Sequence, residues 1–183
     1  MNIILVILLV LLATIALLLV VALFIPREYL IRREVIIERS VSEVFNYIKF
    51  LKNQDHFSKW VRVDPDMKKD HRGVDGTVGF VYAWDGNNKA GAGEQEIIDI
   101  RDGERIDIEI RFIRPFESIA KTAFLTERIA ENQTRVIWSM DGKSKYPLNL
   151  MNLLMGGMLG KDLQTGLEML KNNLEKVPTA KSY

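Results

Sequence analysis

The sequence predicts an α+β protein in which an antiparallel sheet of about six to seven strands wraps around a long C-terminal helix, preceded by one transmembrane helix. Three observations predict this class. An uncharged apolar run occupies residues 3–25, consecutive segments between residues 78 and 141 alternate apolar and polar side chains, and leucines recur at helical spacing within residues 148–176. Strands in unbroken succession, closed by one helix, are typical of α+β domains.

The N-terminal run, Ile3 to Ile25, holds no charged residue, and Thr14 is its one polar side chain. Its length of about 23 residues gives about 34 Å of helix, enough to cross a hydrocarbon core about 30 Å thick. A buried core helix would show a polar stripe, and a signal peptide has a shorter apolar stretch and a small-residue cleavage site. We therefore expect a single-pass membrane anchor. Arg27 follows it, so the positive-inside rule predicts a cytoplasmic domain.

The length of 183 residues suits one anchor at 1–26, one domain at 27–177 and a frayed tail at 178–183. The formal net charge of +1 gives no electrostatic footprint for nucleic acid, so we expect no nucleic-acid partner. The chain has no cysteine, which excludes disulfides, thiolate catalysis and cysteine-ligated metals.

The domain opens with a predicted strand from Tyr29 to Arg39, rich in β-branched side chains. Ser40-Val41-Ser42-Glu43 follows as a capping box, which predicts a helix start. A second short helix is expected from Asn53 to Trp60. Val78, Phe80, Tyr82 and Trp84 then alternate with smaller side chains and predict one face of a strand.

The remaining strands follow at short intervals, joined by turn residues such as Asp102-Gly103. The clearest alternation places Ile106, Ile108, Ile110 and Phe112 on the inner face of one strand, with Asp107, Glu109 and Arg111 outside. The predicted strands are 92–101, 106–112, 118–128 and 134–141.

Leu148 to Lys176 predicts the closing helix, with Leu163, Leu167, Leu170 and Leu174 on one face. Among the predicted elements of the domain, this helix alone is long enough to cover the apolar face of the sheet. The space between sheet and helix can hold a ligand wherever side chains leave it empty.

This order of elements resembles the START-like (SRPBCC) superfamily, whose architecture is called the helix-grip fold. The nearest likeness is to bacterial polyketide cyclase/dehydrase-like proteins, some of which carry an N-terminal membrane helix. The residues that carry the resemblance are Ser40–Ile48, Phe57-Ser58-Lys59-Trp60, Gly91-x-Gly93, Thr134-x-Val136-x-Trp138-x-Met140-x-Gly142 and Gly166-Leu167-x-x-Leu170-Lys171. The resemblance implies a cavity that holds lipids, polyketides or sterols, or that serves a cyclase or hydrolase.

We expect the cavity wall to come from aromatic, isoleucine and methionine side chains, which suit a pocket as a group although each taken singly is more typical of solid core. The candidates are Trp60, Phe80, Tyr82, Trp84, Ile108, Ile110, Phe112, Phe124, Trp138, Met151, Met155 and Met158. Gly156, Gly157 and Gly160 could form a flexible gate, because glycine weakens a helix. The alternatives are a loop before a shorter helix, or close packing against the sheet.

No catalytic residue, metal site or cofactor is predicted. His56 and His71 lie in polar surroundings without ligand partners at metal-binding spacing. The expected function is therefore binding of a hydrophobic small molecule or lipid by a membrane-anchored domain. The alternatives are a cyclase or hydrolase that uses Tyr82 or a cavity carboxylate, and a protein-interaction module whose partner surface is the outside of the sheet, as in chaperone-activating members of the superfamily.

Overall fold

A computed structural model describes residues 2–176, so the predicted tail at 178–183 lies outside the described residues. Its helices are α1 (Ile3–Phe24), α2 (Val41–Ile48), η1 (Leu51–Asn53), α3 (Gln54–Phe57), η2 (Val61–Val63), η3 (Leu148–Met151) and α4 (Asn152–Lys176). Its strands are β1 (Glu28–Ile37), β2 (Lys68–Arg72), β3 (Val81–Asp85), β4 (Ala92–Arg101), β5 (Arg105–Arg114), β6 (Ser118–Ala130) and β7 (Gln133–Lys143).

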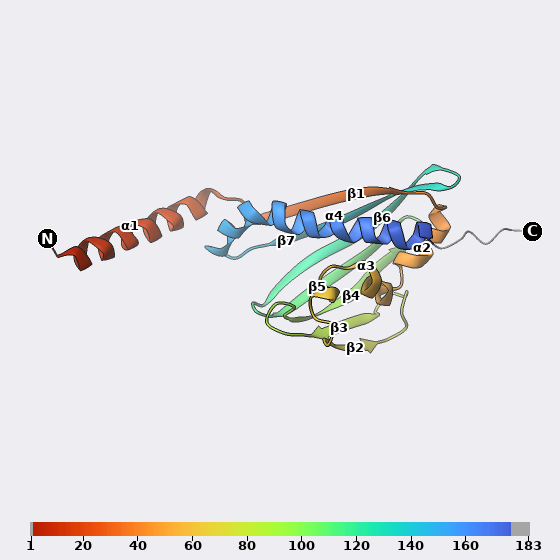
Figure 1. Cartoon of the computed structure of the whole chain (residues 1–183), viewed down its shortest axis with the longest axis horizontal. Helices are drawn as coiled ribbons and strands as arrows, with labels where there is room; N and C mark the ends of the chain where they lie inside the picture. Colours follow the sequence, from red (N-terminus) through yellow and green to blue (C-terminus); the bar gives the residue numbers. More distant parts are fainter. Residues whose placement is uncertain (1, 177–183) are drawn as a thin grey trace, which may run out of the picture.

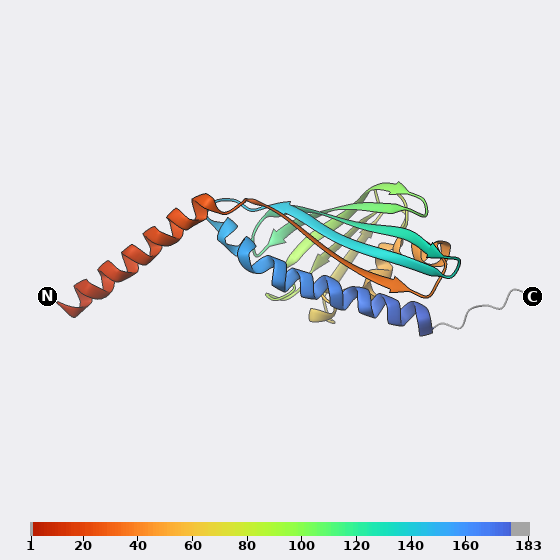
Figure 2. The same ribbon diagram turned by 90° about the horizontal axis from the view of Figure 1, so that it is seen from above.

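The seven strands form one antiparallel sheet in the order β1-β7-β6-β5-β4-β3-β2. Consecutive strands are neighbours except β1, which pairs with β7 in register from Glu28 opposite Lys143 to Ile37 opposite Thr134. The sheet curves, and α4 runs along one face of it, while α1 projects away from the end where β1 begins (Figures 1 and 2). This arrangement confirms the predicted fold class.

The start of α2 shows how local chemistry sets the element boundaries. The Ser40 backbone N–H donates to Glu43 Oε2 at 3.0 Å, and the Glu43 N–H donates to Ser40 Oγ at 3.4 Å. This reciprocal pair is the predicted capping box. Val44, Phe45 and Ile48 then lie on the buried face of α2.

Two predicted boundaries are wrong. The strand expected from Val78 begins at Val81, because Gly79 adopts a positive φ of 86° that ends the extended conformation, and Val78 is left exposed. The helix expected from Asn53 to Trp60 is instead the short pair η1 and α3, which ends at Phe57. Neither the backbone conformation of a glycine nor a change of helix type can be recognised easily from the sequence.

The interior is solid where the middle of α4 meets the sheet. Leu163, Leu167 and Leu170 are fully buried there. Gly166 allows a close approach, because a Cβ at this position would lie 2.6 Å from Trp138 Cζ3. Trp138 also stacks on Phe124 at 4.7 Å between ring centroids, so this side of the indole is packed against the core.

The outer face of the sheet carries the polar half of the alternation. Arg111 donates to Glu94 Oε1 at 2.8 Å, Glu96 Oε2 at 2.6 Å and Glu109 Oε1 at 2.8 Å. Hydrogen bonds to these carboxylates raise the pKa of Arg111 above its ordinary value. Glu109 and Arg111, which the sequence places between the inward side chains of β5, therefore pair with each other on the outside.

Candidate ligand-binding site

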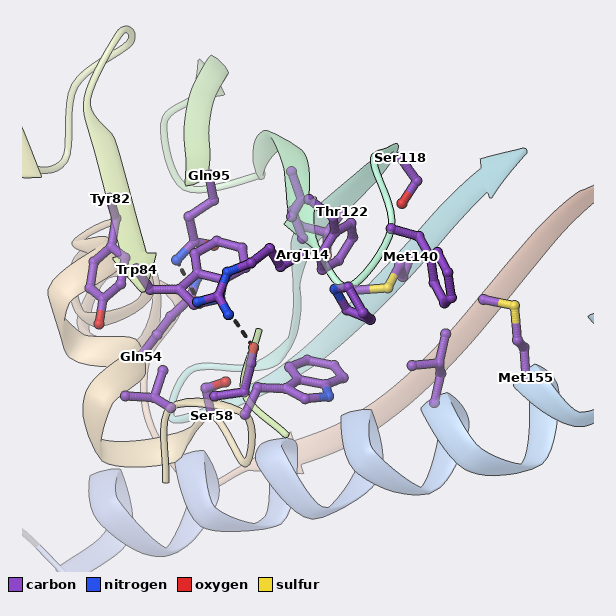
Figure 3. Close-up of a pocket in the computed structure, with 18 of the residues that line it drawn as sticks. Gln54, Ser58, Tyr82, Trp84, Gln95, Arg114, Ser118, Thr122, Met140 and Met155 are labelled. Carbon is purple, nitrogen blue, oxygen red and sulfur yellow. Dashed lines mark hydrogen bonds between the residues drawn. The ribbon is translucent and has the colours of Figure 1, made fainter. Parts of the chain in front are cut away.

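A pocket of about 520 Å³ lies between the sheet and the first half of α4, beside the solid region (Figure 3). This volume falls within the range of small-molecule sites. Its lining comes from the strands, from the segment after α3, and from η3 and α4. The lining residues are Tyr29, Gln54, Ser58, Trp60, Val61, Met67, Tyr82, Trp84, Ala90, Gln95, Ile110, Phe112, Arg114, Pro115, Phe116, Ser118, Thr122, Trp138, Met140, Met151, Met155 and Leu159.

Aromatic rings make up much of the wall, and all three tryptophans of the chain take part. Trp60 meets Trp138 edge to face at 5.8 Å between ring centroids, and Trp84 meets Phe112 in the same way at 6.0 Å. The Trp138 Nε1 proton is donated to Thr122 Oγ1 at 2.9 Å. Because this polar edge already has a partner, the indole can present an apolar surface to a ligand.

The pocket also has a small polar region. Gln95 Nε2 donates to Gln54 Oε1 at 3.2 Å, and both side chains are buried (Figure 3). A glutamine amide has two donors and one acceptor oxygen, so this single bond leaves capacity on each side chain. One polar group of a bound molecule could therefore be oriented here, as is usual in a mainly apolar site.

Tyr82 contributes its ring to the wall, but its hydroxyl is engaged elsewhere. Its Oη donates to Asp55 Oδ1 at 2.6 Å, and Asp55 Oδ2 accepts from Lys69 Nζ at 2.7 Å. Burial, and then the bond to Asp55, raise the pKa of Tyr82 above its ordinary value. The phenol therefore stays protonated near neutral pH, and its proton is directed to a carboxylate outside the lining.

Arg114 is the one charged side chain among the described lining residues, and it pairs with Asp85. Exposed lining residues are confined to two segments, Arg114 to Ser118 in the β5–β6 turn and Met151 at the end of η3. The mouth of the pocket therefore lies between this turn and the start of α4.

The structure brings eight of the twelve expected wall residues together, and their contact with a ligand stays a prediction. These eight are Trp60, Tyr82, Trp84, Ile110, Phe112, Trp138, Met151 and Met155. Phe80, Ile108 and Phe124 belong to the buried core instead, in one cluster with side chains of α2, α3 and the second half of α4. Met158 faces away from the sheet and is exposed.

The polar region and the mouth were not predicted from the sequence. Gln95 and Thr122 are inward-facing members of β4 and β6, in phase with Ile97 and Phe124, so a polar residue at an inward position was the available signal. Phe116 lies in a turn, where alternation carries no information about direction.

The expected gate glycines lie within α4, which is continuous from Asn152 to Lys176. A Cβ added to Gly156 or Gly157 would meet no atom within 4 Å. A Cβ at Gly160 would contact the guanidinium of Arg33 on β1. Close packing thus explains Gly160, while packing gives no reason for glycine at the other two positions.

We expect Gly156→Ala and Gly157→Ala each to raise the free energy of unfolding by about 1 kcal/mol, because alanine favours the helix and the space is open. Denaturant unfolding followed by tryptophan fluorescence measures this. If the glycines form a gate, the double variant should also release a bound fatty acid more slowly. Unchanged release from a stabilised double variant would contradict the gate.

The fold and the pocket together define a helix-grip domain with an apolar cavity under its C-terminal helix. Residues 30–175 match the family described as polyketide cyclase / dehydrase and lipid transport, and the chain belongs to that family.

Solved structures share the fold at low sequence identity. A protein from Thermus thermophilus is 14% identical over 80% of this chain and 97% of its own, with a TM-score of 0.60. Truncated norcoclaurine synthase from Thalictrum flavum is 10% identical over 81% and 94%, with a TM-score of 0.61. A protein from Nitrosospira multiformis is 16% identical over 80% and 96%, with a TM-score of 0.57. No curated protein matches the sequence.

Proposed function

We propose that this chain is a single-pass membrane protein whose domain, residues 27–177, binds a hydrophobic small molecule or lipid in the pocket beneath α4. The observation that carries the proposal is the pocket itself, a hollow of about 520 Å³ walled by aromatic and methionine side chains. An apolar cavity of this size with few polar groups favours an apolar ligand. The family description, which includes lipid transport, supports the same class of ligand.

The contacts of α1 support its role as a permanent anchor at residues 1–26. Its side chains are exposed along nearly the whole helix, so it is not a core helix. At its end, Asn149 Nδ2 donates to the carbonyl oxygens of Ala22 at 2.6 Å and Ile25 at 2.8 Å. If α1 were removed as a signal peptide, the Asn149 amide would lose both acceptors. This loss would be costly, because the side chain is buried in the intact chain. Arg27, immediately after the helix, favours a cytoplasmic domain.

The pocket chemistry favours binding over conversion of the ligand. Tyr82, the lining residue that the sequence suggests as an acid–base group, donates its proton to Asp55 rather than into the cavity. The fold alone does not decide the matter, because a cavity of one architecture can serve many functions.

The test uses the tryptophans as reporters, because all three line the pocket. Full-length protein in detergent is titrated with dibromostearic acid, whose bromine atoms quench tryptophan at contact. We expect saturable quenching that unbrominated stearic acid reverses by competition. Quenching that rises linearly without saturation, as in the micelle alone, would contradict a binding site.

A further inference from the structure

We infer that the mouth of the pocket is embedded in the surface of the membrane that α1 spans, so that its ligand is a lipid taken directly from that leaflet. This inference rests on the proposed anchor and pocket, and it adds the source of the ligand and its route. Three independent features of the described residues support it.

The first feature is the depth at which the domain grips α1. Tyr146 Oη donates to the carbonyl oxygen of Leu19 at 3.1 Å, and Asn149 reaches those of Ala22 and Ile25. Leu19 lies about 9 Å from Ile25 along a helix that rises about 1.5 Å per residue. The segment that contacts these carbonyls must therefore lie at the level of the last turns of α1, near the boundary between acyl chains and headgroups.

The second feature is the position of the mouth relative to the joint, by which we mean the hydrogen bonds from Tyr146 and Asn149 to the end of α1. Met151, at the rim, is two residues from Asn149 in the chain, and the joint is extended by Asn152, which donates to Pro26 O at 2.9 Å. The β5–β6 turn, which forms the opposite rim, lies at the same end of the domain as α1 (Figures 1 and 2). A fixed joint beside the mouth holds the mouth at the membrane surface.

The third feature is the composition of the surface around the mouth. From Tyr146 to Gly160 the sequence has no charged residue, although this stretch includes the exposed first turns of α4. Phe116 is 70% exposed, Leu153 68%, Leu154 59% and Met158 65%. Large apolar side chains this exposed and this close together are unusual on a surface that faces water, and an interfacial helix buries such a face in the headgroup region.

These features favour the bilayer over a protein partner as the occupant of the apolar surface. The surface is continuous with the helix that would already be in the membrane, and Tyr146, an aromatic side chain with a polar tip, lies where both meet. Tyrosine is enriched at this depth in membrane proteins. Arg27 and Lys145 flank the joint with positive charge, which suits anionic headgroups.

The test places single environment-sensitive labels in a chain that lacks native cysteine. Leu153→Cys, Leu154→Cys and Met158→Cys carry the fluorophore NBD in the full-length protein in phosphatidylcholine nanodiscs. None of the three lines the pocket. Leu12→Cys within α1 is the inserted control. Ile129→Cys, at the end of β6 away from α1, is an apolar surface control that should stay in water (Figure 1).

We expect the labels at Leu153, Leu154 and Met158 to show blue-shifted emission, quenching by doxyl lipid and loss of quenching by aqueous iodide, as at Leu12. Labels that behave as at Ile129 while Leu12 is in lipid would overturn the inference. A label at Leu12 that stays in water would overturn it as well, together with the anchor. Dibromostearate titration in detergent separates the two proposals. Saturable quenching together with labels that stay in water supports the binding pocket and overturns its position in the membrane. Labels buried in lipid without saturable quenching support the position in the membrane and overturn the binding pocket.

Discussion

Larger side chains on α4 that fill part of the pocket should weaken ligand binding by at least about tenfold, which corresponds to about 1.4 kcal/mol. The variant is Met155→Phe with Leu159→Phe, two half-buried residues that face the cavity from the helix. Larger rings at both positions would occupy space that a ligand needs, while their exposure lets the helix accommodate them without repacking the core. Dibromostearate quenching of tryptophan in detergent measures the dissociation constant.

The matched control is Leu153→Phe with Leu154→Phe, which makes the same change of size on the same helix outside the lining. In detergent it should bind dibromostearate as the parent protein does. Equal affinity of the pocket-filling variant and this control would mean that the ligand does not occupy the cavity. Equal unfolding midpoints of both variants would exclude a general loss of structure as the cause.

Replacing Gly166 with valine should lower the free energy of unfolding by about 3 kcal/mol, the upper part of the range for overpacking a core. A Cβ at this position would lie 2.6 Å from Trp138 Cζ3 and 3.2 Å from the carbonyl oxygen of Phe57. Neither neighbour can yield easily, because the indole is packed against Phe124 and the carbonyl belongs to the backbone. We expect α4 to be displaced from the sheet, which would also open the pocket to solvent.

Gly157→Val provides the comparison, since it adds the same side chain to the same helix where no atom lies within 4 Å. Its effect should be small, because valine is a somewhat better helix former than glycine. Chemical denaturation of both proteins, followed by circular dichroism and tryptophan fluorescence, gives the two free energies. Similar stability of the two variants would show that contact between α4 and Trp138 does not fix the position of the helix.

Most of the secondary structure could be predicted from the sequence because the signals are local. The capping box at Ser40 fixes a helix start through groups three residues apart. The alternation from Ile106 to Phe112 assigns an inner and an outer face to β5, and the buried and half-exposed positions follow it. The boundary near Gly79 could not be predicted, because glycine is compatible with both a strand and a turn.

The candidate site was predictable in kind but not in extent. Trp84 and Phe124 both belong to inward-facing rows, yet Trp84 lines the pocket and Phe124 stacks on Trp138 in solid core. What separates them is where the middle of α4 packs tightly against the sheet. That packing depends on contacts such as the one between Gly166 and Trp138, which are 28 residues apart in the sequence and so leave no local pattern.

An apolar N-terminal helix, an antiparallel sheet and a closing helix can be predicted from the residues alone, because hydrophobic periodicity and capping act over a few neighbouring residues. Where the interior is hollow, which way the mouth opens and how the domain contacts α1 become visible only in the folded chain. Those properties depend on how side chains from distant segments fill space and satisfy one another's hydrogen bonds. Asn149 has no distinguishing pattern in the sequence, and its hydrogen bonds to α1 form only because η3 lies beside the end of that helix.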